Sequence, residues 1–129
     1  MSICPNNCNN ILNGDNFKHT ISISDIINGK REILSLDNIS IIATYKTKGS
    51  DVKSFVATKT GSVFVNCVYS TTDKKLKVLF QDYDLDNGEL YGTIVIKVQD
   101  SDYPSGEAVY TRYVTLGINL VGEADMING

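Results

Sequence analysis

Residues 17–23 read Phe17-Lys18-His19-Thr20-Ile21-Ser22-Ile23 and alternate apolar or aromatic side chains with polar ones. A period of two puts every second side chain on the same side of an extended chain, which is typical of a β-strand with one buried face. The sequence therefore predicts a strand over this stretch, with His19 on its inner side.

Similar runs follow towards the C-terminus, separated by residues that favour turns. Asn28-Gly29 offers the two positive-φ positions of a type I′ hairpin turn. Asn87-Gly88 predicts a tight turn within residues 82–90, the segment nearest to a helix signal. Seven or eight short strands without a credible helix predict an all-β fold, an antiparallel β-sandwich or a barrel. The further strands are expected over residues 31–36, 39–46, 55–58, 62–69, 75–80, 91–98 and 108–120.

The run over residues 62–69 differs from the others because both of its faces are partly apolar. Val63, Val65 and Cys67 share one face, whereas Phe64 and Val68 share the other. Apolar residues on both faces are typical of a strand that is covered on both sides. We therefore expect residues 62–69 to form one central strand.

The chain divides into three parts by composition. Residues 1–16 contain six Asn, one Pro and two Cys, a mixture that favours turns, and predict a flexible N-terminal arm. Ile11 and Leu12 are apolar neighbours that can pin the end of this arm to the domain. The β-domain is expected over residues 17–120, and a short C-terminal tail over residues 121–129.

Length and composition are those of one soluble globular domain. The chain has 129 residues, 42% of them hydrophobic and 21% charged. This length is enough for a core without disulfides or metals. No apolar stretch is long enough for a membrane helix, and the first residues lack the features of a signal peptide. A membrane is therefore not expected as a partner, and neither is a nucleic acid, because no basic run alternates with aromatic residues.

The net charge of −3 conceals an uneven distribution along the chain. Residues 18–77 contain ten Lys or Arg against five Asp or Glu, and residues 82–129 contain two against nine. If the two halves interleave in a sandwich, their fields largely cancel. If they occupy different faces, they favour head-to-tail or offset contacts between copies of the protein.

Residues suited to catalysis or metal binding are few. Residues 82–88 resemble the start of a calcium loop, but Gly88 is one position late and position twelve is Thr93 rather than Glu. A solvated acidic turn is the simpler interpretation. Asp84 and Glu89 form a carboxylate pair of the kind that glycosidases use, although their place on a turn favours solvation.

Cys4 and Cys8 form a Cys-x₃-Cys pair near the N-terminus. A structural zinc ion needs four ligands, and only Cys67 and His19 remain, both expected to face inward from strands. Free thiols are the simplest interpretation of Cys4 and Cys8, and a disulfide formed after release into an oxidising medium is the alternative. The sequence predicts no catalytic, cofactor-binding or metal site, and therefore no enzyme.

Tyr110 and Tyr113 fall on opposite faces of the last predicted strand, so at least one is expected to meet solvent or a partner. Exposed tyrosines suit protein interfaces. Packing of the ring on a cross-strand neighbour is the alternative.

Four short segments, in this order, resemble small all-β structural proteins of tailed phages that infect Bacteroides-type gut bacteria, especially the crAss-like group. The resemblance covers residues 12–120. Such proteins are similar to the Ig-like domains of baseplate and fibre adaptors, in which a Gly-Asp-Phe entry starts the first strand; here Asn16 separates Asp15 from Phe17. The segments are Leu12-Asn13-Gly14-Asp15-Asn16-Phe17, Leu85-Asp86-Asn87-Gly88-Glu89-Leu90, Asp100-Ser101-Asp102-Tyr103-Pro104-Ser105-Gly106 and Leu116-Gly117-Ile118-Asn119-Leu120.

The resemblance implies an Ig-like sandwich in a virion, made in the cytoplasm of the bacterial host. It implies a head-fibre or capsid-surface protein that contacts other virion proteins, with a baseplate or tail-fibre adaptor or a receptor-binding module as the runner-up. Assembly by repeated contacts predicts a homo-oligomer, a dimer or a trimer. A carbohydrate-binding surface adhesin, which would use exposed tyrosines and acidic turns, is the other alternative.

Overall fold

The computed structural model describes residues 9–123, which form eleven strands in three sheets. The largest sheet has the strand order β1-β11-β10-β5-β6-β7, the second has the order β2-β9-β8, and β3 pairs with β4 in a separate hairpin. In chain order the strands are β1 (Asn9–Leu12), β2 (Phe17–Ile21), β3 (Ser24–Ile27), β4 (Lys30–Ile33), β5 (Ile39–Thr47), β6 (Ser50–Thr60), β7 (Val63–Val65), β8 (Cys67–Ser70), β9 (Lys75–Phe80), β10 (Gly88–Gln99) and β11 (Glu107–Val121).

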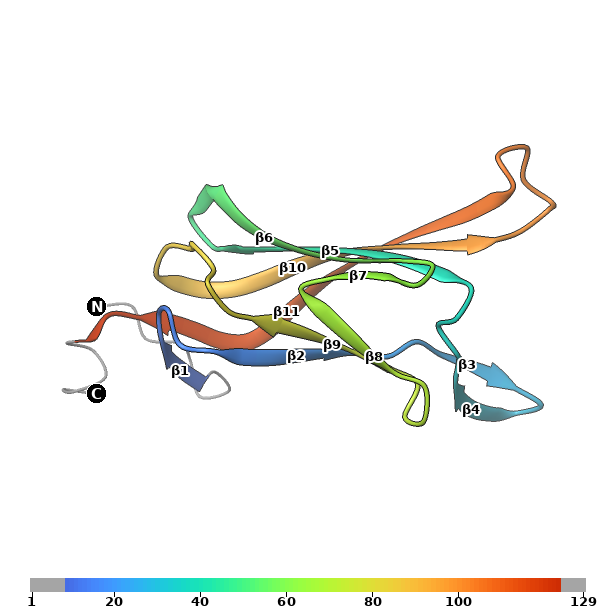
Figure 1. The fold of residues 1–129 in the computed structure, drawn as a ribbon, viewed down its shortest axis with the longest axis horizontal. Helices are drawn as coiled ribbons and strands as arrows, with labels where there is room; N and C mark the ends of the chain where they lie inside the picture. Colours follow the sequence, from blue (N-terminus) through green and yellow to red (C-terminus); the bar gives the residue numbers. More distant parts are fainter. Residues whose placement is uncertain (1–8, 124–129) are drawn as a thin grey trace.

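The two larger sheets lie face to face in two layers (Figure 1). In this view β5, β6, β7 and β10 of the six-stranded sheet lie above the three-stranded sheet, and β11 runs from the upper right down to β1 at the lower left. The β3–β4 hairpin lies at the opposite end from β1. The predicted all-β sandwich is therefore confirmed. The predicted Asn28-Gly29 turn is also found: both residues have positive φ, 53° and 80°, and Ile27 pairs with Lys30 across it.

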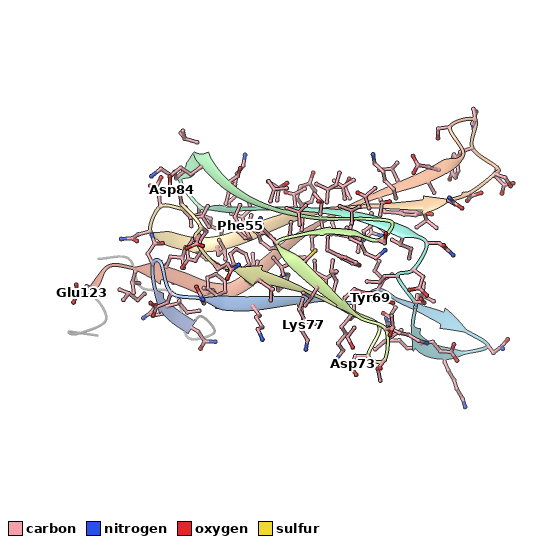
Figure 2. All side chains as sticks on the ribbon, viewed as in Figure 1. Phe55, Tyr69, Asp73, Lys77, Asp84 and Glu123 are labelled. Carbon is pink, nitrogen blue, oxygen red and sulfur yellow. The ribbon has the colours of Figure 1, made fainter. Side chains whose placement is uncertain are left out.

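The core lies between the two layers because the strands alternate buried with more exposed residues. In β5 every second residue from Ile39 to Thr47 is buried, and in β9 the same is true of Leu76, Val78 and Phe80. These inner faces meet each other, so apolar area is removed from water on both sheets at once. Figure 2 shows Phe55, from β6, between the sheets.

An aromatic cluster occupies one half of this core, with Phe80 at its centre. The Phe80 ring stacks on Phe17 and Phe55, with centroid distances of 4.3 and 4.6 Å. Tyr45 and Tyr83 meet the same ring edge-on, at 4.8 and 6.0 Å. Stacked and edge-on geometries are both favourable for aromatic pairs, so the five rings hold the sheets together beyond their buried area.

The segment over residues 62–69 is not one central strand as predicted. Asn66 has a φ of 57° and interrupts the run, leaving β7 in the six-stranded sheet and β8 in the three-stranded one. Each of these strands is the edge strand of its sheet. Both faces of the segment are partly apolar because the chain passes from one layer to the other: Cys67 is buried, whereas Val63 and Val65 are exposed.

Residues 9–16, which the sequence analysis assigned to the N-terminal arm, form a strand and a turn attached to the domain. β1 pairs in parallel with the end of β11, with Asn9 opposite Ile118 and Leu12 opposite Val121. This pair is an exception to the antiparallel pattern predicted for the sandwich. Ile11 packs against the core, in agreement with its expected pinning role. Residues 1–8 and 124–129, the rest of the predicted arm and most of the tail, lie outside the described residues.

Three of the four segments that carry the family resemblance meet at the end of the molecule where β1 pairs with β11. The Asn13 amide donates to the Leu85 carbonyl oxygen at 2.8 Å and to the Asn87 side chain at 2.9 Å. Gly88 pairs with Leu120 across β10 and β11. The segments are thus parts of one packing arrangement, which gives them a structural role.

Candidate interaction surfaces

His19 and Cys67, which the sequence analysis singled out, are both inner-face residues, as predicted, with partners inside the protein. The His19 Nδ1 atom and the Tyr45 hydroxyl are 2.8 Å apart, and burial lowers the pKa of His19. The Cys67 thiol donates to the Thr58 carbonyl oxygen at 3.2 Å, and burial raises its pKa. A neutral imidazole and a protonated, buried thiol stabilise the fold, and neither is placed to attack a substrate.

The lowered pKa of His19 predicts a pH-dependent stability. The neutral imidazole is favoured in the folded protein, whereas the unfolded chain takes up a proton near the usual value of 6.5. Below that pH the unfolded state therefore binds more protons than the folded state. The free energy of unfolding that the neutral His19 contributes above pH 6.5 is lost as the pH falls towards the lowered pKa. Urea unfolding at about pH 7.5 and about pH 5.5 should show this loss.

The matched control for this pH effect is His19→Gln, which has no proton to bind in this range. Its stability is expected to change less between the two pH values than that of the wild type. An equal change in both proteins would contradict the assignment of the effect to His19.

Lys59 is a buried cation that the sequence analysis did not single out. Its ammonium group donates to the Ile39 carbonyl oxygen at 2.9 Å, and its Nζ atom lies 5.8 Å from the ring centroid of Tyr69 and 6.0 Å from that of Phe64. Such contacts favour a cation over aromatic faces. In the sequence, Lys59 alternates with Phe55 and Ala57 and so shares their face of the strand. That this face is buried follows only from the pairing of β6 with β5.

The acidic loop after β9 does not converge on a cation site. The Asp84 and Asp86 carboxylates both face the Lys53 ammonium group, at 3.2 and 3.3 Å, and Asp86 also accepts from the Ser50 hydroxyl. The bonds to Ser50 and Lys53 hold the pKa of Asp86 below its usual value. Figure 2 shows Asp84 beside the β5–β6 hairpin.

Glu89 of the carboxylate pair binds Lys48 instead, at 3.0 Å. Among the described residues, no group of three or more His, Cys, Asp or Glu side chains is arranged to hold a metal ion. Cys4 and Cys8 lie outside the described residues. Within residues 9–123, no helix is long and apolar enough to span a membrane.

The end of the β10–β11 hairpin projects from the rest of the molecule (Figure 1). We call residues 100–107 the hairpin tip; they carry three carboxylates and no basic side chain. The backbone amide of Asp102 donates to the Asp100 carboxylate at 3.0 Å, which fixes the turn. Within the described part of the chain, the Asp102 and Glu107 carboxylates have no hydrogen-bond or ion-pair partner. The ring of Tyr103 is half exposed.

Next to the tip, one edge of β11 is free. β10 pairs with β11 over residues 107–115 and again at Asn119 and Leu120, but on the opposite edge β1 covers only the residues from Ile118 onwards. No other described strand pairs with this edge over residues 107–117, which we call the free edge. Val109, Tyr110 and Tyr113 are exposed here, and the edge contains neither a Pro nor a Lys. Its charged residues are Glu107 and Arg112, and the Arg112 guanidinium donates to the Thr111 carbonyl oxygen at 3.0 Å. Tyr110 and Tyr113 lie on opposite faces, as predicted.

The outer face of the six-stranded sheet, the side turned away from the three-stranded sheet, has no charge at its centre. Val, Ile and Thr side chains fill this centre, and many remain exposed, including Ile42, Val56 and Val65. Lys46 and Lys97 lie one row to each side of it. An uncharged surface with several exposed apolar side chains offers area that a partner can cover. The central rows are Thr111, Val95, Ile42, Thr58 and Val65, followed by Tyr113, Thr93, Thr44 and Val56.

The outer face of the three-stranded sheet has a different chemistry. Lys77 stands in its middle, opposite Thr20 on one side and Val68 on the other. Lys18 and Lys75 share this face, and Figure 2 shows Lys77 pointing away from the six-stranded sheet. The strands contribute no acidic residue to the face, which we call the basic face. Its members are Lys18, Thr20, Val68, Ser70, Lys75, Lys77 and Leu79.

The structure thus presents a free edge, an uncharged outer face and a basic face for contacts with other molecules. The alternation of residues in the sequence indicated faces of this kind, but it did not indicate which strands lie next to one another. Comparison of the chain with protein-family models, with curated proteins and with solved structures found no match.

Proposed function

We propose that this protein is a non-enzymatic structural component of a phage virion, in a head fibre or on the capsid surface, and that it acts through protein–protein assembly contacts. The observation that carries the proposal is the free edge of β11 beside the uncharged outer face. An edge of unpaired backbone groups is a template for the addition of a strand from another protein. The uncharged rows next to it, with Ile42, Val56 and Val65 exposed, offer area that a partner can cover.

The stiffness of the domain also supports an assembly role. Five aromatic rings join the two sheets, and the β11 edge belongs to a strand that is paired with β10 over residues 107–115. An interface held by such a frame loses little conformational entropy when a partner binds. The place in the virion follows from the family resemblance, with a baseplate or tail-fibre adaptor as the runner-up.

Cross-linking mass spectrometry of purified phage particles tests this function. Lys46 and Lys97 flank the uncharged outer face, so amine-reactive cross-links from these two lysines to other virion proteins are expected. The identity of the cross-linked proteins separates a head position from a tail position. Absence of the protein from purified particles, or particles without any cross-link from Lys46 or Lys97 to another virion protein, would refute the proposal.

A carbohydrate-binding role is the second candidate, because a hollow of about 570 Å³ lies on the inner side of the hairpin. Tyr110 and Arg112 border it, with the Arg112 guanidinium 5.9 Å from the Tyr110 ring centroid. An aromatic ring beside a hydrogen-bond donor is suited to a sugar. Binding to a glycan array that is lost in Tyr110→Ala would support this role, and an array without any bound glycan would exclude it.

A further inference from the structure

We propose that the basic face is the docking site for the hairpin tip of a second copy of this chain, so that copies associate head to tail. This inference rests on the proposed assembly function and names one of its partners. It is carried by the opposite charges of two surfaces that lie on different parts of the same molecule.

The first of these surfaces, the basic face, is a sheet face that nothing covers among the described residues. Lys18, Lys75 and Lys77 give it three positive charges, and their ammonium groups have no ion-pair partner in the described part of the chain. Val68 is half exposed beside Lys77, and Leu79 pairs with Lys18, so apolar area lies between the charges. A hollow of about 240 Å³ borders the face at Phe17 and Leu79.

The second surface, the hairpin tip, complements the first. Its three carboxylates match the three ammonium groups in number and are opposite in sign. The half-exposed ring of Tyr103 offers an aromatic side chain for the apolar part of the face. Complementary potentials of this kind speed up encounter and fix the orientation of two partners.

The tip and the basic face of one copy cannot meet each other. The tip projects from the six-stranded sheet, whereas the basic face is the far side of the three-stranded sheet, with the core between them (Figure 1). A contact between a tip and a basic face therefore requires two copies of the chain. A contact between two different surfaces is heterologous, and its repetition gives a closed ring or an open chain of copies.

Sedimentation velocity of the full chain at about 50 mM and about 500 mM salt is the first test. Concentration-dependent association is expected at low salt, and weaker association at high salt, because ions screen contacts between exposed charges. A protein that stays monomeric at low salt at all concentrations would overturn the inference.

Two charge-reversal variants test whether these two surfaces meet. One carries Asp102→Lys and Glu107→Lys in the tip, and the other carries Lys75→Glu and Lys77→Glu in the basic face. Each alone should associate at least about tenfold more weakly than the wild type, because its tip and face then have the same sign. A one-to-one mixture should associate again, since each positive surface then finds a negative one.

Matched controls change the charge elsewhere by the same amount. Glu32→Lys with Asp37→Lys, and Lys30→Glu with Arg31→Glu, alter exposed residues around the β3–β4 hairpin and should leave association within about twofold of the wild type at the salt concentration used for the tip and face variants. Thermal unfolding of every variant checks that it is folded, and the mixture itself checks it again, because unfolded partners do not restore binding.

Three outcomes overturn the inference: tip and face variants that associate as well as the wild type, control variants that lose association equally, or a mixture that fails to restore it. Each leaves the proposed virion function standing if cross-links to other virion proteins are found in particles. Conversely, restored association in the mixture together with a protein absent from particles would refute the virion function alone.

Discussion

Phe80→Ala is expected to lower the free energy of unfolding by about 3–5 kcal/mol, which is the usual range for the removal of a buried aromatic ring. The ring is 1% exposed and touches four other rings, Phe17, Tyr45, Phe55 and Tyr83. Its removal leaves a cavity between two sheets that cannot close without a shift of the whole three-stranded layer. Urea unfolding followed by circular dichroism measures the change.

Tyr113→Ala is the matched control for this substitution. Tyr113 lies on the outer face of β11 and is 81% exposed, so the removal of its ring should cost no more than about 1 kcal/mol. Similar losses in the two variants would mean that the aromatic cluster does not hold the layers together.

Asn66→Val is expected to destabilise the protein by about 2–3 kcal/mol. Asn66 has a φ of 57°, a conformation that is strained for a β-branched residue, and its amide donates to the Val56 carbonyl oxygen at 2.9 Å. The Asn66 carbonyl oxygen also accepts from the backbone amide of Leu79 at 2.8 Å, so a change of backbone conformation disturbs β9 as well.

Asn66→Gly separates the two contributions in this prediction. Glycine adopts positive φ without strain but lacks the side-chain amide of Asn66. Asn66→Gly should therefore lower the free energy of unfolding by no more than about 1 kcal/mol. If valine and glycine gave equal losses, the backbone conformation at the passage between the sheets would not be the cause. Equilibrium unfolding of both variants under identical conditions decides the question.

Local signals were sufficient to predict most of the strands. The strand predicted over residues 75–80 has the bounds of β9, and the hairpin turn at Asn28-Gly29 has the positive φ values expected of it. Alternation of side chains and the conformational preferences of Asn and Gly depend on neighbours in the sequence, so a single chain reveals them.

Features that depend on distant partners were not predictable. Asn66 breaks the run over residues 62–69 because Val65 pairs with β6, whereas Cys67 pairs with β9, and neither partner is adjacent in sequence. The Asn-rich residues of β1 have a low intrinsic preference for strands, and Asn9 is extended beside Ile118 through a contact over more than a hundred positions.

The candidate surfaces were predictable only in part. The sequence indicated opposite faces for Tyr110 and Tyr113 and an uneven distribution of charge. The basic and acidic halves of the chain could interleave or occupy different faces, and the structure contains both arrangements. In the six-stranded sheet the basic and acidic halves interleave, because β10 pairs with β5. At the basic face and the hairpin tip they remain apart, and only the strand order decides which residues lie at these positions.

The parallel pairing of β1 with the end of β11 has a mechanical consequence. A pull on the two ends of the described chain acts at Asn9 and beyond Val121, which are opposite ends of the same strand pair. The hydrogen bonds between these strands are then loaded together, in shear, whereas the strands of a hairpin pulled at its open end separate one bond at a time. The short β1–β11 pair therefore carries this tension first, and the rest of the domain is loaded only after the pair has separated.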